Sequence, residues 1–303
     1  ELEWLRAGGK RIYGFAYGAD VRLREATLAL GRWNFCTECP SVAAFCLCDD
    51  STGAVALQQA MTHLTASVAL GDMLTYLPGA RNLHYWPINV EQLPLASPPR
   101  MDSILRIVHA PNHTHFKGTH YLETAIKNLK SEGHAISYVR VQGKTNLQVI
   151  RFFREADLVA DQFLGGIFGY SALEAMACGR PVITYVRAPA LVEAVDECPV
   201  LNATPDVLED VLRWCLTNRA KLRELGAQGR AYVARWHSIE AVAARLGRLY
   251  LDTADFPPSI AKRLEAFLVA ERQRRAAIEL PGFDHPFRVA GASCARLNGL
   301  PTQ

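Results

Sequence analysis

The residues best suited to chemistry in this sequence form a glycine loop that leads into a short helix. The stretch ADQFLGGIFGYSALEAMACGRPVITYV occupies residues 160–186. Gly165, Gly166 and Gly169 give the loop little side-chain bulk, and helical periodicity over residues 170–178 begins directly after it. A helix that starts at the carboxyl end of a buried parallel strand directs backbone N–H groups and a positive dipole end at its ligand. This pattern predicts an anion-binding site.

Glu174 adds a second kind of group to this site. It lies one turn inside the expected helix, so its carboxylate can reach neutral hydroxyl groups near the loop. The N–H groups of Gly169, Tyr170 and Ser171 would meanwhile hold the anion. A ligand that carries both a diphosphate and a ribose needs this combination of groups.

Lys117 is the candidate positive charge for the phosphates. It follows the loop after a strand expected at residues 104–109 and precedes Gly118, so its ammonium can point toward the helix terminus at Gly169. The alternative is a solvated surface lysine. His113 and His115 lie in the same loop, but without a nearby carboxylate they are weak evidence for a metal, and hydrogen bonding to phosphate or acceptor suits them better.

The motif F-G-x-x-x-L-E-A-M-A-C-G-x-P-V at residues 168–182 resembles the donor-binding signature of glycosyltransferase family 4, the glycosyl transferases group 1. The resemblance implies a GT-B fold with two Rossmann-like doubly wound α/β domains. It also implies sugar transfer from a nucleotide-diphosphate sugar with retained configuration and no catalytic metal. In such a site Lys117 and a neighbouring cation hold the donor diphosphate, and Glu174 binds the ribose.

Two positions depart from the family pattern. The arginine that accompanies the lysine in the family falls near Asn112 or His113 here. The first glutamate of the family pair, which contacts the donor sugar, falls at Gly166. Asp161, at the end of the preceding strand, could substitute for that carboxylate and is the second candidate catalytic residue beside Lys117.

Composition and charge restrict the class of protein. The chain has 303 residues, half of them hydrophobic, and no apolar run of membrane-spanning length, which predicts a soluble protein. A net charge of +3 permits phosphorylated ligands or peripheral contact with an anionic membrane face but argues against nucleic acid. The chain begins with Glu1 and its first methionine is Met61, which favours an N-terminal truncation and no signal peptide.

Eight cysteines without an extracellular spacing pattern favour the cytoplasm, and four of them form the most unusual local cluster. The spacing C-x2-C-x6-C-x-C favours a structural zinc that stabilises an insertion at residues 36–48, with an iron–sulfur cluster or two disulfides as alternatives. Four free buried thiols are less compatible with this density. The proposed ligands are Cys36, Cys39, Cys46 and Cys48.

Alternating strand and helix patterns predict the domain organisation. Residues 1–98 read as a partial, acceptor-side Rossmann-like domain, residues 99–255 as the donor-binding domain, and residues 256–303 as an amphipathic helix with a tail. Prolines around residues 94–99 mark the linker. The expected strands are residues 11–17, 66–70, 82–86, 104–109, 135–141, 158–160, 182–186 and 198–201. The main expected helices are residues 51–64, 119–131, 146–155, 170–178, 205–217, 220–236, 239–251 and 259–278.

These features together favour a glycosyltransferase of the hexosyltransferase type, acting on a glycan or glycolipid acceptor. A non-catalytic nucleotide-sugar- or glycan-binding or assembly protein is the alternative, in which Gly166 and the absent arginine record lost catalysis. A nucleotide-sugar epimerase would need an acid–base pair that the sequence does not reveal. The nucleotide, the sugar, the acceptor and the oligomeric state are not determined by the sequence.

Overall fold

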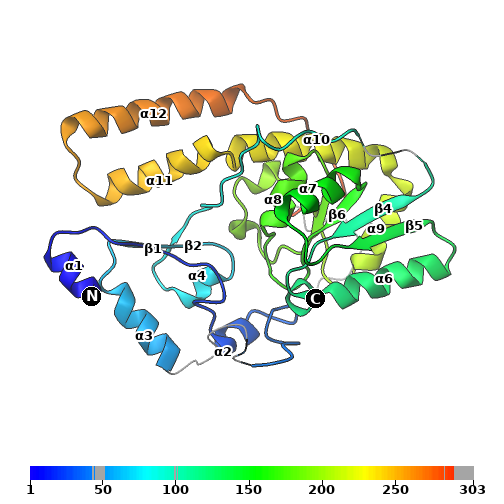
Figure 1. The fold of residues 1–303 in the computed structure, drawn as a ribbon, viewed down its shortest axis with the longest axis horizontal. Helices are drawn as coiled ribbons and strands as arrows, with labels where there is room; N and C mark the ends of the chain where they lie inside the picture. Colours follow the sequence, from blue (N-terminus) through cyan, green and yellow to red (C-terminus); the bar gives the residue numbers. More distant parts are fainter. Residues whose placement is uncertain (43, 45–51, 99, 101, 283, 290–303) are drawn as a thin grey trace. The chain divides into compact units, whose positions relative to one another are not determined.

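The computed structural model describes residues 1–42, 44, 52–98, 100, 102–282 and 284–289. The chain divides into two compact units. Unit 1 comprises Glu1–Trp86 with Glu240–Ala277, and unit 2 comprises Pro87–Ile239 with the described residues from Ile278 onward. Each unit contains a parallel sheet (Figure 1). The predicted α/β class with two parallel sheets is therefore confirmed.

Unit 1 is built on a sheet of short parallel strands in the order β1-β2-β3. Tyr13 in β1 pairs with Ala66 in β2, and Val68 in β2 pairs with Arg81 in β3. The strands are β1 (Tyr13–Phe15), β2 (Ala66–Ala69) and β3 (Arg81–Asn82). The helices are α1 (Leu2–Ala7), α2 (Arg24–Leu28), α3 (Thr52–Met61), α4 (Met73–Tyr76), most of α11 (Ile239–Thr253) and α12 (Pro258–Ala277).

The last strand of unit 1 is shorter than expected. The expected strand at residues 82–86 is wrong beyond Asn82, where β3 ends. Tyr85 makes side-chain contacts instead of strand hydrogen bonds. Its hydroxyl donates to the Ala16 carbonyl, and its ring lies 5.2 Å from the Phe15 ring. Hydrophobic residues here satisfy packing without a strand ladder.

Helix α11 groups with unit 1, although the sequence placed residues 239–251 with the donor-binding domain. The Tyr13 and Tyr250 rings lie 4.9 Å apart edge to face, and the Tyr13 hydroxyl lies 2.9 Å from Thr253 Oγ1. Arg245 Nε donates to the His84 carbonyl at 3.0 Å. These contacts are long-range in sequence, so the local pattern gave no sign of them.

The long helix α12 was expected to be amphipathic, but Glu271 is its one buried residue among those described. Leu264 and Leu268 pack toward Gly247 of α11, where a Cβ atom would approach Leu264 Cδ1 to 2.8 Å. Phe267 and Val269 remain exposed. Ala261, Leu264 and Leu268 are partly buried at helical spacing, so one side of the helix packs while the other is exposed.

Unit 2 is a doubly wound sheet with helices on both faces. The strand order is β5-β4-β6-β7-β8, and all pairs are parallel. The strands are β4 (Leu105–His109), β5 (Ile136–Arg140), β6 (Leu158–Ala160), β7 (Val182–Thr184) and β8 (Leu201–Asn202). The main helices are α5 (Thr114–Lys117), α6 (Thr119–Ser131), α7 (Asn146–Glu155), α8 (Tyr170–Ala177), α9 (Leu208–Thr217) and α10 (Arg219–Trp236).

The helices of unit 2 pack in two layers. Helix α6 packs with α9, whereas α8 packs with α7 and α10 (Figure 1). The core between the sheet and the α6–α9 layer contains Leu105 and Ile107 of β4 together with Leu122 and Leu129 of α6, all fully buried. Strands β6 and β7 are buried along their whole length, as expected for parallel strands covered on both faces.

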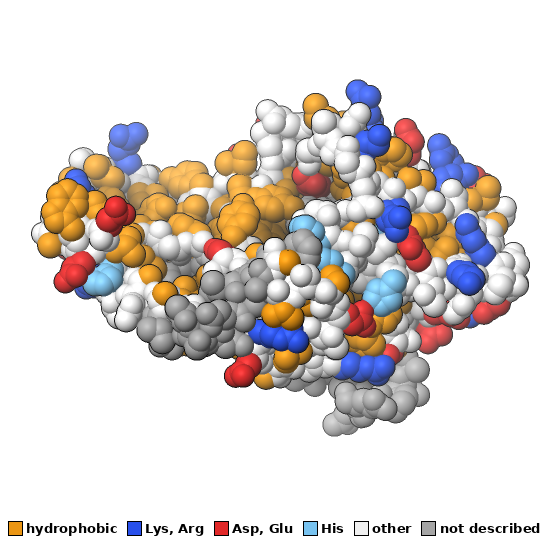
Figure 2. Space-filling model, turned by 60° about the horizontal axis from the view of Figure 1, so that its bottom comes forward, with side chains coloured by type: hydrophobic (Ala, Val, Ile, Leu, Met, Phe, Trp, Pro, Cys, Tyr) orange, Lys and Arg blue, Asp and Glu red, His pale blue; other side chains and the backbone are white. Residues whose placement is uncertain are grey.

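The charged side chains on the surface are distributed as the small net charge of +3 suggests. On the face that Figure 2 shows, basic and acidic side chains are interspersed with hydrophobic ones, and no broad basic surface is visible among the coloured atoms. Within the described part of the chain, no helix combines the length and the apolar character that a membrane span requires.

Candidate functional site

The candidate site lies where the strand order of unit 2 reverses. The chain moves from β4 outward to β5 and then returns to β6 on the other side of β4. The loops after β4 and β6 leave the same edge of the sheet, since His109 pairs with Ala160 at the ends of both strands. Such a switch point at the carboxyl ends of parallel strands is where open α/β sheets bind ligands.

Lys117, Asp161 and Gly169 meet at this edge. Lys117 Nζ donates to Asp161 Oδ1 at 2.8 Å, and the Gly169 backbone N–H donates to Asp161 Oδ2 at 2.6 Å. The Asp161 side chain has no exposed surface, while the Lys117 side chain is 12% exposed. The ammonium is thus fixed by a buried carboxylate and still reaches solvent.

The backbone around Lys117 explains how the lysine reaches this point. Residues 114–117 form the single turn α5, which the sequence had suggested was a polar loop. Gly118 ends this turn at φ 66°, and a Cβ atom there would lie 3.2 Å from Phe163 Cβ. The Lys117 carbonyl accepts the Phe163 N–H at 3.1 Å. Glycine is required here both for the left-handed conformation and for the close approach of the next loop.

His109 joins the strands beneath the site. Its Nδ1 lies 2.9 Å from the Ala160 carbonyl, and its Nε2 lies 2.8 Å from Thr119 Oγ1. Because a carbonyl can only accept, Nδ1 carries the proton and Nε2 accepts from the threonine hydroxyl. The pKa of His109 is lowered to about 4, mainly by burial and to a smaller extent by the charge of Lys117. The neutral ring therefore links β4, β6 and the start of α6.

Glu174 lies one turn into α8 and is held by a residue that the sequence did not single out. Asn146 Nδ2, at the start of α7, donates to Glu174 Oε1 at 2.7 Å. Burial raises the pKa of Glu174, the Asn146 hydrogen bond lowers it, and the charge of Asp161 raises it. A half-buried carboxylate with one oxygen already bonded is suited to a neutral hydroxyl partner.

The loop between β6 and α8 is fixed by its own backbone. Gly166 has φ 65°, and its carbonyl accepts the Arg187 N–H at 2.8 Å. Gln162 Nε2 donates to the Ile167 carbonyl, and the Gln162 carbonyl accepts the Tyr185 N–H at 2.8 Å. A glutamate at residue 166 would have to adopt a left-handed conformation at a cost of about 1–2 kcal/mol. Residue 166, where the family has a glutamate, therefore has a backbone conformation that favours glycine.

The predicted residues do not all converge. Lys117, Gly118, Asp161 and Gly169 lie together, and the first turn of α8 contains Tyr170 and Ser171. The Gly169 N–H, which was expected to hold the anion, bonds to Asp161 instead. Asn112 and His113 are exposed, and the Asn112 side chain accepts the His113 N–H at 2.9 Å. The His113 carbonyl in turn accepts the Lys117 N–H at 3.1 Å, so these two residues begin the turn that ends at Lys117.

His109 and Asn146 are the contributors that sequence reasoning missed. Both residues were placed in the correct elements, but no motif distinguished them. The position of Asn146 directly after Thr145, which forms a capping box with Gln148, could have shown that its side chain starts a helix at the site edge.

The cysteine cluster is only half within the described residues. Cys36 is buried in a tight turn in which its carbonyl accepts the Cys39 N–H at 3.4 Å, and Asn34 Oδ1 accepts the Cys36 N–H at 2.8 Å. Cys46 and Cys48 lie outside the residues that the structure describes. Among the described residues, no group of three His, Cys, Asp or Glu side chains is arranged to hold a metal ion. The zinc site stays a prediction.

The arrangement at the switch point can bind an anion and a hydroxyl group side by side. The Lys117 ammonium and the N-terminal end of α8 supply positive charge, and Glu174 supplies an acceptor one turn away.

Residues 101–218 match a family model described as "Glycosyl transferases group 1". These residues form a group 1 glycosyltransferase domain. The domain contains Lys117, Asp161, Gly169 and Glu174.

The fold of the chain that contains this glycosyltransferase domain is also similar to the folds of solved structures. Sucrose-phosphate synthase from Thermosynechococcus elongatus is 19% identical, with a TM-score of 0.50, over 67% of this chain and 62% of that one. TarM from S. aureus, a variant solved with fondaparinux, α-GlcNAc-glycerol and UDP, is 14% identical, with a TM-score of 0.53, over 79% of this chain and 50% of that one. The two parallel sheets thus match GT-B glycosyltransferases, and the chain spans 50–62% of the length of these two proteins. No curated protein matches the sequence.

Proposed function

We propose that unit 2 binds a nucleotide-diphosphate sugar at the β4–β6 switch point and that the protein transfers the sugar to a glycan or glycolipid. The observation that carries the proposal is the Lys117 ammonium, which Asp161 holds 2.8 Å away at the end of the sheet where α8 begins. Lys117 and the N–H groups of Tyr170 and Ser171 would bind the diphosphate, and Glu174 would bind the ribose. Positive charge at the leaving diphosphate would lower the barrier to transfer.

In this proposal Asp161 positions Lys117, whereas the sequence had suggested a catalytic role for its carboxylate. Both of its carboxylate oxygens are bonded within the protein, and its side chain has no exposed surface. These contacts suit a positioning residue that orients Lys117, whereas a residue that contacts the donor sugar must be accessible. Retention of configuration, a hexose as the transferred sugar and transfer without a catalytic metal follow from the family resemblance.

The setting of the reaction is also part of the proposal. We place the protein in the cytoplasm, at or near a membrane face that carries the acceptor, and expect no nucleic acid partner. Three buried cysteines in unit 2, Cys178, Cys198 and Cys215, are in the thiol form, and burial raises the pKa of each. Buried thiols of this kind persist in a reducing compartment.

A titration with UDP-, GDP-, ADP- and TDP-sugars tests the donor site. One nucleotide class should stabilise the chain by about 2.7 kcal/mol at 100 times its dissociation constant, measured as a thermal shift. UDP-sugars come first because the TarM structure contains UDP. Lys117→Ala should weaken binding about 10- to 100-fold, as expected for a lost charged hydrogen bond, and Glu174→Ala about 10-fold.

Lys127→Ala is the matched control, because Lys127 is an exposed lysine on α6 and its removal should leave the affinity unchanged. No stabilisation of a folded chain by any nucleotide sugar would refute the donor site. If a nucleotide sugar binds but no acceptor in a panel causes release of nucleoside diphosphate, the result would favour the alternative of a non-catalytic nucleotide-sugar-binding protein.

Gly169→Ala is expected to separate binding from folding. The backbone at Gly169 has φ −99°, which any residue adopts, but the added Cβ atom would lie 3.1 Å from Lys117 Nζ. The flexible lysine can move aside, so the free energy of unfolding should fall by only about 1 kcal/mol. The displaced ammonium should weaken nucleotide-sugar binding at least about 10-fold in the same titration.

Gly8→Ala provides the comparison for this substitution. A Cβ atom at Gly8 would meet no atom nearer than 3.5 Å, and the residue lies in unit 1. Equal nucleotide affinity in the Gly169 variant and in the wild type would show that the ammonium does not bind the ligand.

A further inference from the structure

A cavity of about 300 Å³ lies at the opposite edge of the unit 2 sheet from the donor site. Asp157 lines it directly before β6, and Arg180 lines it two residues before β7. The donor-site residues Asp161 and Gly169 follow β6 instead. The cavity is therefore at the amino ends of the strands, and the linker segment at residues 96–98 forms one of its walls.

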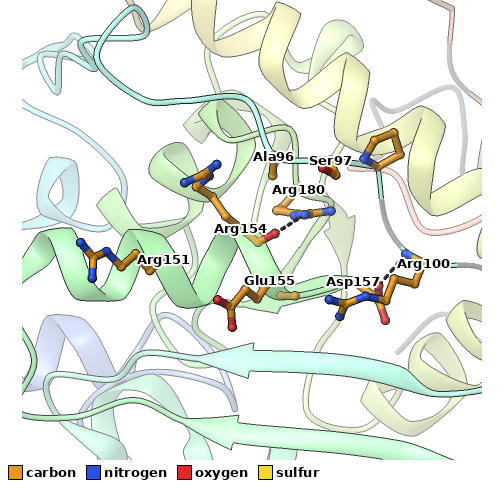
Figure 3. A pocket seen from close by; sticks show the side chains of 10 residues that line it. Ala96, Ser97, Arg100, Arg151, Arg154, Glu155, Asp157 and Arg180 are labelled. Carbon is orange, nitrogen blue, oxygen red and sulfur yellow. Dashed lines mark hydrogen bonds between the residues drawn. The ribbon is translucent and has the colours of Figure 1, made fainter.

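The lining of this cavity is rich in arginine. Figure 3 shows the side chains around it, with four arginines and two acidic residues: Arg100, Arg151, Arg154, Arg180, Glu155 and Asp157. Asp157 is already neutralised, since its Oδ2 lies 2.8 Å from Arg219 Nη2 and 3.3 Å from Arg106 Nη1, and neither of these arginines lines the cavity. The lining thus carries four arginines against two acidic residues, of which Asp157 is already paired.

Arg180 is the group that most needs an anionic partner. The residue is 3% exposed, and its Nη2 donates to the Arg154 carbonyl at the end of α7 (Figure 3). Its Nε and Nη1 are buried and have no hydrogen-bond partner among the described residues. Burial lowers the pKa of Arg180, the charge of Asp157 partly offsets this effect, and the charges of Arg100 and Arg154 lower the pKa again by smaller amounts. Leaving a buried charged donor unsatisfied is costly, so an anion in the cavity would be strongly favoured.

We propose that this arginine cavity binds a small molecule through a phosphate group, as a phosphate monoester or a diphosphate, independently of the donor site. Guanidinium groups match phosphate oxygens with paired hydrogen bonds, and several arginines around one cavity are suited to a doubly charged group. The volume exceeds that of one phosphate and lies at the lower end of the range for small-molecule sites. A ligand the size of a sugar phosphate is therefore expected.

A neighbouring groove gives room for the rest of the ligand. It has a volume of about 290 Å³ and shares Arg151 and Glu155 with the arginine cavity. Lys144, just before α7, lines it together with Gln148 and Phe152 of α7. The groove adds another positive charge and an aromatic ring, both of which can contact the non-phosphate part of the ligand.

Helix α7 separates the two sites. Asn146 at its start bonds to Glu174 of the donor site, and Arg154 near its end lines the arginine cavity. Ten residues at about 1.5 Å each make the helix roughly 15 Å long. Variants of one site should therefore leave the ligand contacts of the other intact, which allows both proposals to be tested separately.

Calorimetric titration with pyrophosphate and with a hexose 6-phosphate tests the proposal on the full chain. Arg151 and Arg154 are exposed, so Arg151→Gln with Arg154→Gln should preserve the fold and weaken binding of at least one probe about 10-fold or more. The control, Lys127→Gln with Lys130→Gln, removes the same charge from exposed positions on α6 and should change the affinity less than about two-fold. Arg180→Met should abolish binding, and if that variant does not fold the exposed pair decides the question.

Further arms identify the site and the source of the phosphate. Pyrophosphate could also enter the donor site, so the titration is repeated with Lys117→Ala, in which the binding that depends on Arg151 and Arg154 should persist. Loss in Lys117→Ala with retention in the double arginine variant would overturn the proposal, as would no binding of either probe. Co-sedimentation with vesicles of phosphatidylcholine and phosphatidic acid should not depend on Arg151 and Arg154. Arginine-dependent vesicle binding without binding of the soluble probes would assign the phosphate to a lipid and refute a small-molecule site.

Discussion

Asp161→Ala is expected to lower the free energy of unfolding by about 3 to 5 kcal/mol, the range for breaking a buried ion pair. The substitution leaves the Lys117 ammonium, which is 12% exposed, without its carboxylate. It also removes the acceptor of the Gly169 N–H, a 2.6 Å hydrogen bond that anchors the start of α8. Urea unfolding followed by circular dichroism measures the change.

Two further variants make this result specific. Glu123→Ala breaks the exposed pair between Glu123 and Arg140, which are 3.0 Å apart, and should cost less than about 1 kcal/mol. Combining Asp161→Ala with Lys117→Met should recover part of the lost stability, because no unpaired ammonium remains. A cost for Asp161→Ala no larger than that for Glu123→Ala would show that the buried pair does not organise the site.

The elements that the sequence predicted correctly have strong local signals. Helices α6 and α7 have the expected bounds, residues 119–131 and 146–155. Helix α6 begins after the left-handed Gly118, and α7 begins at the Thr145 capping box. The single turn α5 has no comparable signal, because four residues are too few to show periodicity. Strand ends were predicted too long at residues 11–17 and 182–186, where hydrophobic residues continue past the ladder.

The site was predictable as a set of residues but not as a set of contacts. Lys117 and Asp161 each follow a predicted strand, and the motif at residues 168–182 indicated the anion. Their pairing depends on β6 lying beside β4, although β5 comes between them in the sequence. The arginine cavity shows the same limit. The contact of Arg180 with the Arg154 carbonyl joins residues 26 positions apart, so no local pattern indicates it.

Acidification from pH 6.5 to pH 4 is expected to destabilise the protein through His109. Burial lowers the pKa of this residue to about 4, whereas an unfolded histidine titrates near about 6.5. Between these values the unfolded state binds more protons, so the free energy of unfolding falls as the pH falls. The contribution is fully present above pH 6.5, and about 3 kcal/mol is lost by pH 4, since each pKa unit corresponds to about 1.4 kcal/mol.

The difference between the wild type and His109→Gln isolates this contribution from the carboxylates and from His285, whose pKa burial also lowers to about 4. The variant should be less stable at pH 7.5 by about 1–3 kcal/mol, because the Ala160 carbonyl and the Thr119 hydroxyl lose their imidazole partner. Its stability should then vary less with pH between 4 and 6.5, as measured by urea unfolding at each pH. The exposed His113→Gln variant should keep the slope of the wild type. If His109→Gln kept the full slope instead, protonation of His109 would not be what weakens the β4–β6 edge, and the neutral imidazole could not be the group that holds the lysine loop and the aspartate together.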